Sequence, residues 1–425
     1  MKKRLLDWIL CPNCGERPAL QVFQEEKVEL PSPVRSPACS FYCGRHDVAH
    51  PQAITPPPDC NSCYREEILE GALACVCGLV YPVVDGIPRM LRNAREEYPE
   101  FFARHGLAGV PKAASAPVSA PISAAVPAAR TADPRSPKSF GMQWTLYQEG
   151  DHTWFKDDAG LRKQEFLYNL QTTPEELRGS TLLDGGCGNG ELTRAVAEYG
   201  PEIVGMDFSR SVEHARRRLF EKGSAVAHKV HYLQGNILEI PLLPASFDMV
   251  HTSGVLHHTP STYRAFRSIS RVVKPGSKLY VQLYRRRPAW IHAVNVSLRA
   301  VTTRLPMNLL YGLCYVTTPV HAGLSRLVHF LRREPAPPKA TARERAVQMF
   351  DNYSPPFQYR HTVPEIMDLF RSEGYTDLQD VTLDNEARHM LAVLGRKVAP
   401  SEAAAPATAA AEPAREASPM TAQTV

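Results

Sequence analysis

The sequence has no long apolar run of the kind that crosses a membrane. A spanning helix needs about 18 or more consecutive apolar residues, and the 425-residue chain contains no such run. We also find no export signal, because the basic segment Met1–Arg4 leads into a short apolar stretch, Leu5–Leu10, that Asp7 interrupts. These absences exclude the usual secreted and integral-membrane classes, and we expect a cytoplasmic protein.

Cysteine is scarce after residue 78, where only two of the ten cysteines lie. In a reducing compartment, clustered cysteine pairs predict metal ligands rather than disulfides. Cys11 and Cys14 form one pair, Cys75 and Cys77 form a tighter one, and four thiolates suit one tetrahedral zinc ion. The insertion between the pairs holds candidates for a second zinc, or else reduced structural thiols: Cys39, Cys43, Cys60 and Cys63.

The composition divides the chain into four parts. The 37 prolines are too many for one uniform globular body, and they concentrate in two Ala/Pro-rich stretches. We predict a cysteine-rich zinc domain at 1–108, a flexible linker at 109–139, a catalytic domain at 140–397 and a disordered tail at 398–425.

Residues 140–397 alternate strand-like and helix-like segments. The predicted helices are Glu191–Tyr199, Ser211–Lys222, Ser261–Val273 and Val363–Ser372. The predicted strands are Thr181–Asp184, Glu202–Asp207, Val230–Gln234, Phe247–Thr252, Lys278–Leu283, Leu378–Leu383 and Met390–Leu394. This alternation predicts an α/β fold with a doubly wound, mainly parallel seven-stranded Rossmann-like sheet, which binds ligands at the carboxyl ends of its strands.

The strongest single motif follows the first of these strands. Leu182–Gly190 reads LLDGGCGNG, with an acid, Asp184, at the strand end and glycines at alternate positions. Glycines allow a tight turn and a close approach of ligand to backbone. Dinucleotide-binding folds favour G-x-G-x-x-G instead, so a dehydrogenase is the less favoured alternative class.

The order of motifs resembles class I S-adenosylmethionine-dependent methyltransferases of the type 11 group. After the glycine loop, Asp207 ends the second strand 23 residues beyond Asp184. Gly235–Ile237, Phe247–Val250, Ser253–His258 and Val272–Val281 then follow in the family's order. The resemblance covers about 250 residues.

The resemblance implies a role for each matching residue in binding S-adenosylmethionine. Asp184 and the glycines would face the methionine end, Asp207 would accept hydrogen bonds from the ribose hydroxyls, and Asn236 would meet the adenine amine. Phe208 and Ile237 would sandwich the adenine, or else are ordinary core residues. The implied cofactor-binding set is Asp184, Gly186, Gly188, Gly190, Asp207, Phe208, Asn236 and Ile237.

The segments around the outer cysteine pairs, LLDWILCPNCG and GALACVCGLVYPVVDGIPRML, resemble the small zinc-ribbon protein that activates several methyltransferases. The chain therefore resembles such an activator fused to its enzyme. The zinc would be structural, because a region this poor in periodic apolar residues needs a metal to fold.

Acidic residues are missing from a long basic stretch. Residues 249–333 contain 13 Lys and Arg and no Asp or Glu. The part at about 285–348 is an expected helical insertion over the strand ends, where Pro306 and Pro319 limit helix length. It is a lid, a contact for an anionic or lipid-linked substrate or for the inner membrane surface, or a nucleic-acid contact.

Methyl transfer needs a general base only when the acceptor must lose a proton. Candidate bases are His257, His258 and His361, with Asp351 in the same cluster as His361. The segment 140–144, FGMQW, resembles one that closes over the cofactor.

We predict a methyltransferase acting on a small molecule, with lipid-linked, sugar and secondary-metabolite acceptors all open. One alternative is an RNA methyltransferase with a zinc-ribbon recognition module. Another is a non-catalytic scaffold that binds S-adenosylmethionine and recruits a protein partner through the ribbon. The sequence shows no identifiable RNA-binding module, which disfavours nucleic acid as the partner.

Overall fold

The protein is described here from a computed structural model. The structure describes residues 1–31, 33–34, 38–49, 59–107, 135–146, 159–222, 224–331, 333, 340–384 and 389–399. The predicted linker at 109–139 and tail at 398–425 fall outside these residues, except for 135–139 and 398–399.

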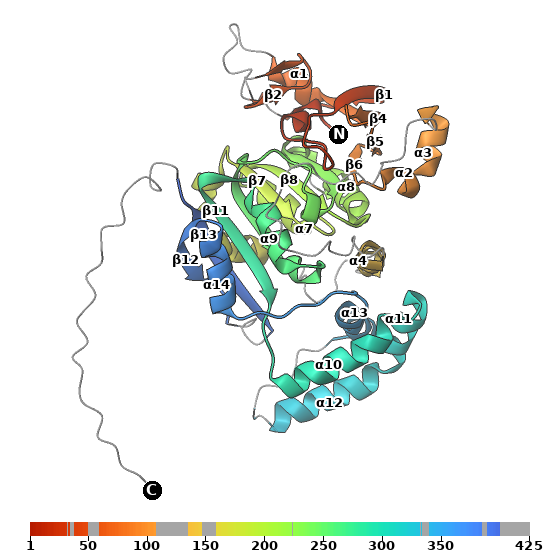
Figure 1. Ribbon diagram of the computed structural model, residues 1–425, viewed down its shortest axis with the longest axis vertical. Helices are drawn as coiled ribbons and strands as arrows, with labels where there is room; N and C mark the ends of the chain where they lie inside the picture. Colours follow the sequence, from red (N-terminus) through yellow and green to blue (C-terminus); the bar gives the residue numbers. More distant parts are fainter. Residues whose placement is uncertain are drawn as a thin grey trace, which may run out of the picture.

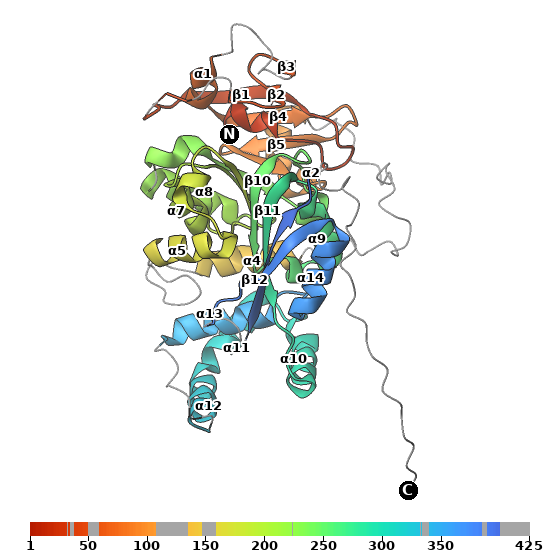
Figure 2. The same ribbon diagram turned by 90° about the vertical axis from the view of Figure 1, so that its left-hand side faces the viewer.

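One twisted sheet of 11 strands organises the described chain (Figures 1 and 2). Its spatial order is β1-β4-β5-β6-β9-β8-β7-β10-β11-β13-β12. The first four strands are β1 (Ala19–Lys27), β4 (Glu66–Ala74), β5 (Val80–Val84) and β6 (Ile87–Met90). The other seven are β7 (Thr181–Gly185), β8 (Glu202–Asp207), β9 (Val230–Gly235), β10 (Phe247–Ser253), β11 (Val273–Tyr284), β12 (Tyr375–Asp380) and β13 (Met390–Lys397). A separate hairpin joins β2 (Tyr42–Cys43) to β3 (Val48–Ala49).

The seven strands from β9 to β12 form the predicted Rossmann-like sheet. β7 through β11 run parallel, and β13 enters antiparallel between β11 and β12. Side chains alternate between two cores: Leu182, Ile203 and Met249 pack on one face, whereas Leu183, Val204 and Val250 pack on the other. Strand residues bury both faces only when helices cover both. The sheet is therefore doubly wound, as predicted.

Helices cover the two faces in sets. One face packs on α5 (Ala159–Leu170), α7 (Glu191–Ala197) and α8 (Ser211–Lys222). The other packs on α9 (Thr262–Ser270) and α14 (Val363–Ser372). Beyond the strand ends lie α4 (Arg135–Leu146), α10 (Ala289–Thr302), α11 (Met307–Val316), α12 (Thr318–Leu331) and α13 (Ala342–Tyr353). The short helices are α1 (Cys60–Arg65), α2 (Ala94–Glu97), α3 (Pro99–Arg104), α6 (Pro174–Leu177), η1 (Lys3–Asp7), η4 (Ser224–Lys229), η5 (Ile237–Glu239) and η6 (Leu256–His258).

Two strands begin earlier than predicted. β11 begins at Val273 rather than Lys278, because Pro275–Gly276 lie inside the strand at a shift of register with β10. β12 begins at Tyr375 rather than Leu378, and its register with β13 shifts where Asp377 has a φ of 52°. Tyr375 starts the strand because its ring packs edge-on against Phe370.

The N-terminal module is joined firmly to the larger sheet. β6 pairs in parallel with β9, so the four N-terminal strands continue the sheet without a break. Trp8 lies beneath the joint, with its ring 5.7 Å from that of Phe247 and the Arg4 guanidinium 3.9 Å above it. Arg4 also pairs with Glu202 of β8 at 3.0 Å. The module is thus one rigid extension of the sheet in the described structure.

Candidate functional site

A cavity of about 290 Å³ opens at the carboxyl ends of the central parallel strands. Ligand pockets commonly span roughly 300–1,000 Å³, so this volume suits a compact small molecule. Its wall comes from the sheet edge, from α4 and α5, and from α13. The lining includes Phe140, Gln143, Trp144, Arg162, Glu165, Asn169, Asp184, Gly186, Asp207, Phe208, Asn236, Ile237, His251, His258, Gln282, Tyr284 and Asp351.

Asp184 lies one residue before the end of β7 and lines the cavity. Its Oδ2 accepts a hydrogen bond of 2.6 Å from the Thr193 hydroxyl, which fixes the carboxylate against α7. Its Oδ1 lies 3.5 Å from Nδ1 of His251, a second cavity residue whose ring stacks on Tyr280 at 4.9 Å. The carboxylate is therefore held between α7 and His251 in the cavity wall.

Asp207 ends β8 and organises the loop around it. Its Oδ2 accepts a hydrogen bond from the Gly188 amide at 3.0 Å, and its Oδ1 accepts from the Ser209 amide and hydroxyl. Burial raises the pKa of Asp207, and these hydrogen bonds oppose the rise. Each carboxylate oxygen has further acceptor capacity, so a ligand diol can bind without displacing the loop.

The glycine loop supports the cavity, but not every glycine touches it. Gly186 lies in the wall, whereas Gly188 and Gly190 are covered by side chains. A Cβ on Gly188, whose φ is +54°, would lie 2.2 Å from the indole of Trp144. Trp144 comes from the predicted closing segment at 140–144, so this segment packs directly on the loop.

The three predicted adenine contacts, Phe208, Asn236 and Ile237, all line the cavity. They follow the ends of neighbouring strands, β8 and β9, which brings them to one edge of the sheet. The Asn236 side-chain oxygen caps η5 by accepting from the Leu238 amide at 3.0 Å. Its amide nitrogen has no such role in the cap and can donate to a ring nitrogen.

The cavity is acidic. Glu165, Asp184, Asp207 and Asp351 line it, and Arg162 is the one Lys or Arg among its described lining residues. Two further wall atoms are buried without a hydrogen-bond partner, Gln143 Oε1 and Asn169 Oδ1. Buried polar atoms are normally paired, so these atoms indicate a polar ligand. An excess of carboxylates favours a cationic ligand over an anionic one.

The three candidate histidines lie in different surroundings. His258 lines the cavity, and burial lowers its pKa to about 4. Its Nδ1 lies 2.9 Å from the Phe357 carbonyl, which can only accept, so Nδ1 carries the proton and Nε2 is left as an acceptor. His257 and His361 are outside the lining. His257 is fully buried beneath it, where burial lowers its pKa well below the ordinary value.

His361 is anchored away from the cavity. Its Nε2 lies 3.1 Å from the Thr262 hydroxyl, and its backbone amide donates to the Tyr284 carbonyl at 2.9 Å. Burial lowers its pKa. These contacts tie the segment before α14 to β11 and to the start of α9.

Asp351 of α13 completes the cavity from the inserted helices. Gln143 donates to its Oδ1 at 2.8 Å, and the Tyr284 hydroxyl donates to its Oδ2 at 3.4 Å. Burial raises its pKa from 3.8 to about 6, against the opposing effects of these two donors and of Arg299. Asp351 and His258 are thus two proton acceptors in one cavity, and only the carboxylate is basic enough to bind a proton near neutral pH.

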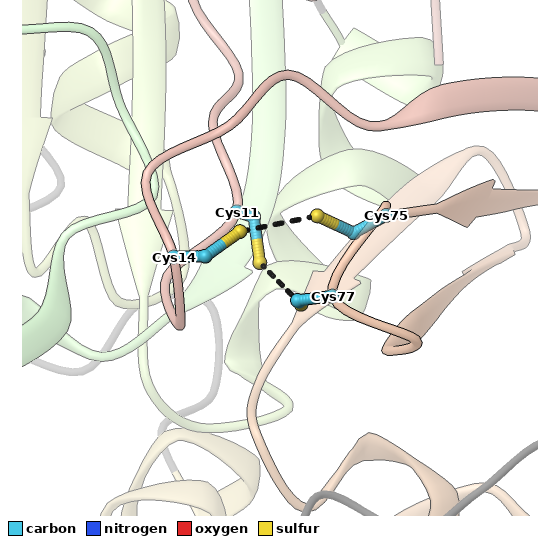
Figure 3. A group of neighbouring side chains, drawn as sticks. All are labelled: Cys11, Cys14, Cys75 and Cys77. Atoms are coloured by element: carbon cyan, nitrogen blue, oxygen red, sulfur yellow. Dashed lines mark hydrogen bonds between the residues drawn. The ribbon is translucent and has the colours of Figure 1, made fainter. Parts of the chain in front are cut away.

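The outer cysteines converge on one point (Figure 3). All four sulfurs, of Cys11, Cys14, Cys75 and Cys77, lie within 4.8 Å of one another. Cys11 and Cys77 are separated by 3.7 Å, and Cys14 and Cys75 by 3.3 Å. Zinc–sulfur bonds of about 2.3 Å in a tetrahedron place sulfurs about 3.8 Å apart, so the spacing fits a zinc ion.

The inner cysteines form a second, looser group. Among the described residues, only the outer four meet the criterion of ligand atoms all within 4.8 Å. Cys39, Cys43 and Cys63 are buried together in a small core with Tyr64. Cys43 Sγ also lies 3.1 Å from Nδ1 of His46. All four inner cysteines are buried, and none of them forms a disulfide.

Comparison with known proteins identifies the centre of the sheet. Residues 183–281 match the methyltransferase domain family. The match runs from β7 into β11 and includes the glycine loop, Asp207, Asn236 and His258.

Two curated relatives have similar sequences over this domain. The ubiquinone biosynthesis O-methyltransferase of Xanthomonas euvesicatoria pv. vesicatoria is 31% identical over 136 residues, 32% of this chain and 56% of the relative. The demethylmenaquinone methyltransferase of Lactococcus lactis subsp. lactis is 33% identical over 123 residues, 28% and 48% of the two chains. The chain thus spans about half the length of the curated relatives it matches.

Solved structures give a weaker likeness. The magnesium protoporphyrin IX methyltransferase of Synechocystis PCC 6803, solved with bound S-adenosylhomocysteine, aligns with 61% of this chain and 97% of its own. The sequence identity is 14% and the TM-score 0.38. At this level the alignment adds nothing to the strand order already described.

Several cavity residues could not be found from the methyltransferase motifs. Arg162, Glu165 and Asn169 come from α5, a helix that the sequence did not separate from its surroundings. Gln282 and Tyr284 come from the end of β11. A polar residue at the carboxyl end of an apolar strand is the only sequence signal that marks Gln282.

Proposed function

We propose that this protein is an S-adenosylmethionine-dependent methyltransferase that acts on a small-molecule acceptor. The acidic cavity carries the proposal, because four carboxylates, two at strand ends and two on the covering helices, suit a ligand bearing a sulfonium and an ammonium group. The same carboxylates would repel the pyrophosphate of a dinucleotide, which disfavours a dehydrogenase. Two of the curated relatives, named ubiquinone biosynthesis O-methyltransferase and demethylmenaquinone methyltransferase, support a small-molecule acceptor.

The cavity residues provide places for each part of the cofactor. Asp207 would accept hydrogen bonds from the ribose hydroxyls, Phe208 and Ile237 would flank the adenine, and Asp184 would face the methionine end. When bound, S-adenosylmethionine supplies an electrophilic methyl group. The chain itself contributes alignment of the acceptor with that group, which is the main source of rate acceleration in such a displacement.

Asp351 is the residue we assign to proton removal. An acceptor hydroxyl that loses its proton on methylation can pass it to the Asp351 carboxylate, which Gln143 and Tyr284 hold in place. His258 is the second candidate, and its Nε2 can accept a hydrogen bond from the acceptor. His257 and His361 then act by packing, since neither lines the cavity.

We also propose one structural zinc ion at the outer cysteines. Cys11, Cys14, Cys75 and Cys77 would supply four thiolates, and the Tyr81 hydroxyl, 3.0 Å from Cys11 Sγ, would orient one of them. Four thiolates leave no open position, so the metal would hold the module together rather than take part in the reaction. A second zinc at the inner cysteines remains a prediction.

Calorimetric titration of the full chain with S-adenosylmethionine, S-adenosylhomocysteine and NAD tests the proposal. We expect the first two to bind and NAD not to bind. Asp207→Asn removes the charge and one acceptor oxygen, so affinity for both should fall roughly 10- to 100-fold. Asp380→Asn, an exposed carboxylate at the end of β12, is the matched control and should bind like the wild type. Binding of NAD alone would overturn the proposal.

A further inference from the structure

The exposed apolar side chains of this protein are concentrated on three helices. The described chain has 19 large apolar residues that are strongly exposed, and 14 of them lie between Trp290 and Leu331. They are Trp290, Val294, Val296, Leu298, Val301, Leu309, Leu313, Tyr315, Val316, Val320, Leu324, Leu327, Phe330 and Leu331. We call this set on α10, α11 and α12 the apolar tip. Such a concentration marks an interaction surface rather than ordinary surface composition.

Helix α10, the first helix of the apolar tip, buries its polar side chains and exposes its apolar ones. The buried residues of α10 are polar, Asn295 and Arg299. Arg299 donates to the carbonyls of Asn352 and Pro355, at 2.5 and 2.6 Å. The apolar residues of α10 face outward instead, with Trp290 71% exposed. A helix that turns its polar face to the protein needs an apolar partner outside it.

The third helix has almost no contact with the core of the protein. Thr318 is the only fully buried residue described on α12. Phe330 and Leu331 at its end are 78% and 70% exposed. Figures 1 and 2 show that α10 and α12 both project from the end of the molecule opposite the cysteine-rich module, and Figure 2 shows them standing apart. The tip can therefore reach a flat surface before the rest of the protein does.

Charge determines which apolar partner fits. Residues 249–333 contain no acid, and Arg304, Arg326 and Arg333 are all exposed on or next to these helices. A second copy of this surface would bring like charges together. The headgroups of anionic lipids attract basic residues at about 1 kcal/mol each near a membrane surface. The combination of apolar side chains and arginines without acids fits an anionic bilayer.

The helix lengths define how the tip meets the bilayer. α10 and α12 each have 14 residues, about 21 Å at a rise of about 1.5 Å per residue, whereas a bilayer core is about 30 Å thick. Among the described helices, none is long and apolar enough to cross a membrane. We propose that the apolar tip inserts into the surface of an anionic lipid bilayer without spanning it.

The apolar tip is packed against the walls of the cavity. Leu310 and Cys314 of α11 form a small core with Ala346 and Phe350 of α13, the helix that carries Asp351. Met142 of α4, next to Gln143, packs against the same core. A membrane-bound acceptor would therefore meet the cavity from the tip side. This last step rests on the proposed function, whereas lipid binding does not.

Flotation of the full-length protein with vesicles tests the docking surface. We expect the protein to float with vesicles of phosphatidylcholine and phosphatidylglycerol, and to bind those of phosphatidylcholine alone more weakly. Trp290→Ser and Phe330→Ser should each weaken binding roughly tenfold, from the loss of one inserted side chain. Arg304→Gln should weaken binding to the anionic vesicles roughly fivefold. Tyr168→Ser, an exposed aromatic on α5, is the matched control and should leave binding unchanged.

The outcomes separate the docking surface from the reaction. Calorimetry with S-adenosylmethionine on each variant shows whether the cavity is intact, because neither Trp290 nor Phe330 lines it. Wild-type protein that stays away from both kinds of vesicle would overturn the proposal, and so would equal flotation of wild type and the two apolar variants. Light scattering could instead detect a dimer of the wild type that Phe330→Ser does not form. That result would show that the apolar tip binds a second copy of the chain, and it would also refute lipid docking.

Discussion

Replacing Asp351 by asparagine should stabilise the protein while reducing its activity. The carboxylate is 7% exposed, and burial raises its pKa from 3.8 to about 6. The folded protein therefore disfavours the charged form that water favours. Asparagine has the same shape and keeps an oxygen for the Gln143 donor, but it carries no charge to desolvate.

The size of the effect follows from the two pKa values. Because the folded-state pKa is the higher one, wild-type stability falls as the pH rises from 3.8 through 6 and then stays level. One pKa unit corresponds to about 1.4 kcal/mol. The shift therefore lowers the wild-type free energy of unfolding by about 3 kcal/mol at pH 8 and by about 1.6 kcal/mol at pH 5. The free energy of unfolding of the Asp351→Asn variant should exceed that of the wild type by these amounts. The difference should therefore be roughly twice as large at pH 8 as at pH 5.

Urea denaturation of wild type and variant at pH 5 and pH 8 measures this difference. Asp380→Asn, which removes an exposed carboxylate far from the cavity lining, serves as the control. A gain that is equal at the two pH values would show that charge burial is not its cause. A destabilised variant would show that the ionised carboxylate is well accommodated, which would refute the reasoning. Activity should fall in the variant if the acceptor loses a proton.

Three further predictions concern the metal, the joint and the glycine loop. Metal analysis should find zinc bound to the purified protein, and Cys14→Ser should lose one equivalent; zinc retained in that variant would belong to the inner cysteines. Trp8→Ala should lower the free energy of unfolding by roughly 3–5 kcal/mol, whereas the exposed Trp290→Ala should change it by less than about 0.5 kcal/mol. Gly188→Ala should displace the Trp144 ring, 2.2 Å from the new Cβ, and weaken S-adenosylmethionine binding in calorimetry.

The sequence predicted the sheet because its strands are buried on both faces. Pairs such as Leu182 and Leu183, or Ile203 and Val204, pack into opposite cores, and a continuous apolar run between helices is typical of such strands. The bounds of β8, α8 and α14 were predicted to the residue. The start of β12 was not, because its pairing depends on β13 and on an aromatic contact of Tyr375.

The union of the two modules could not be predicted from local patterns. Strand β6 joins β9 through residues that are 145 positions apart, Arg89 and Gln234. Pairing of strands so distant in sequence depends on tertiary packing around Trp8, which no periodicity encodes. The predicted zinc ribbon and the predicted sheet were each visible, but their continuity as one 11-stranded sheet was not.

The proposed cofactor side and the proposed acceptor side of the cavity also differ in how far the sequence predicts them. The cofactor side is built from loops that directly follow strands, so the order of the motifs along the chain places Asp184, Asp207 and Asn236 at one sheet edge. The acceptor side is built from α4, α5 and α13, whose residues reach the cavity only through contacts between distant segments, such as Gln143 with Asp351. Under the proposed function, the strands would hold the cofactor, whereas α4, α5 and α13 would contact the acceptor. The proposal therefore places the acceptor on the helical side, where the apolar tip packs against α13.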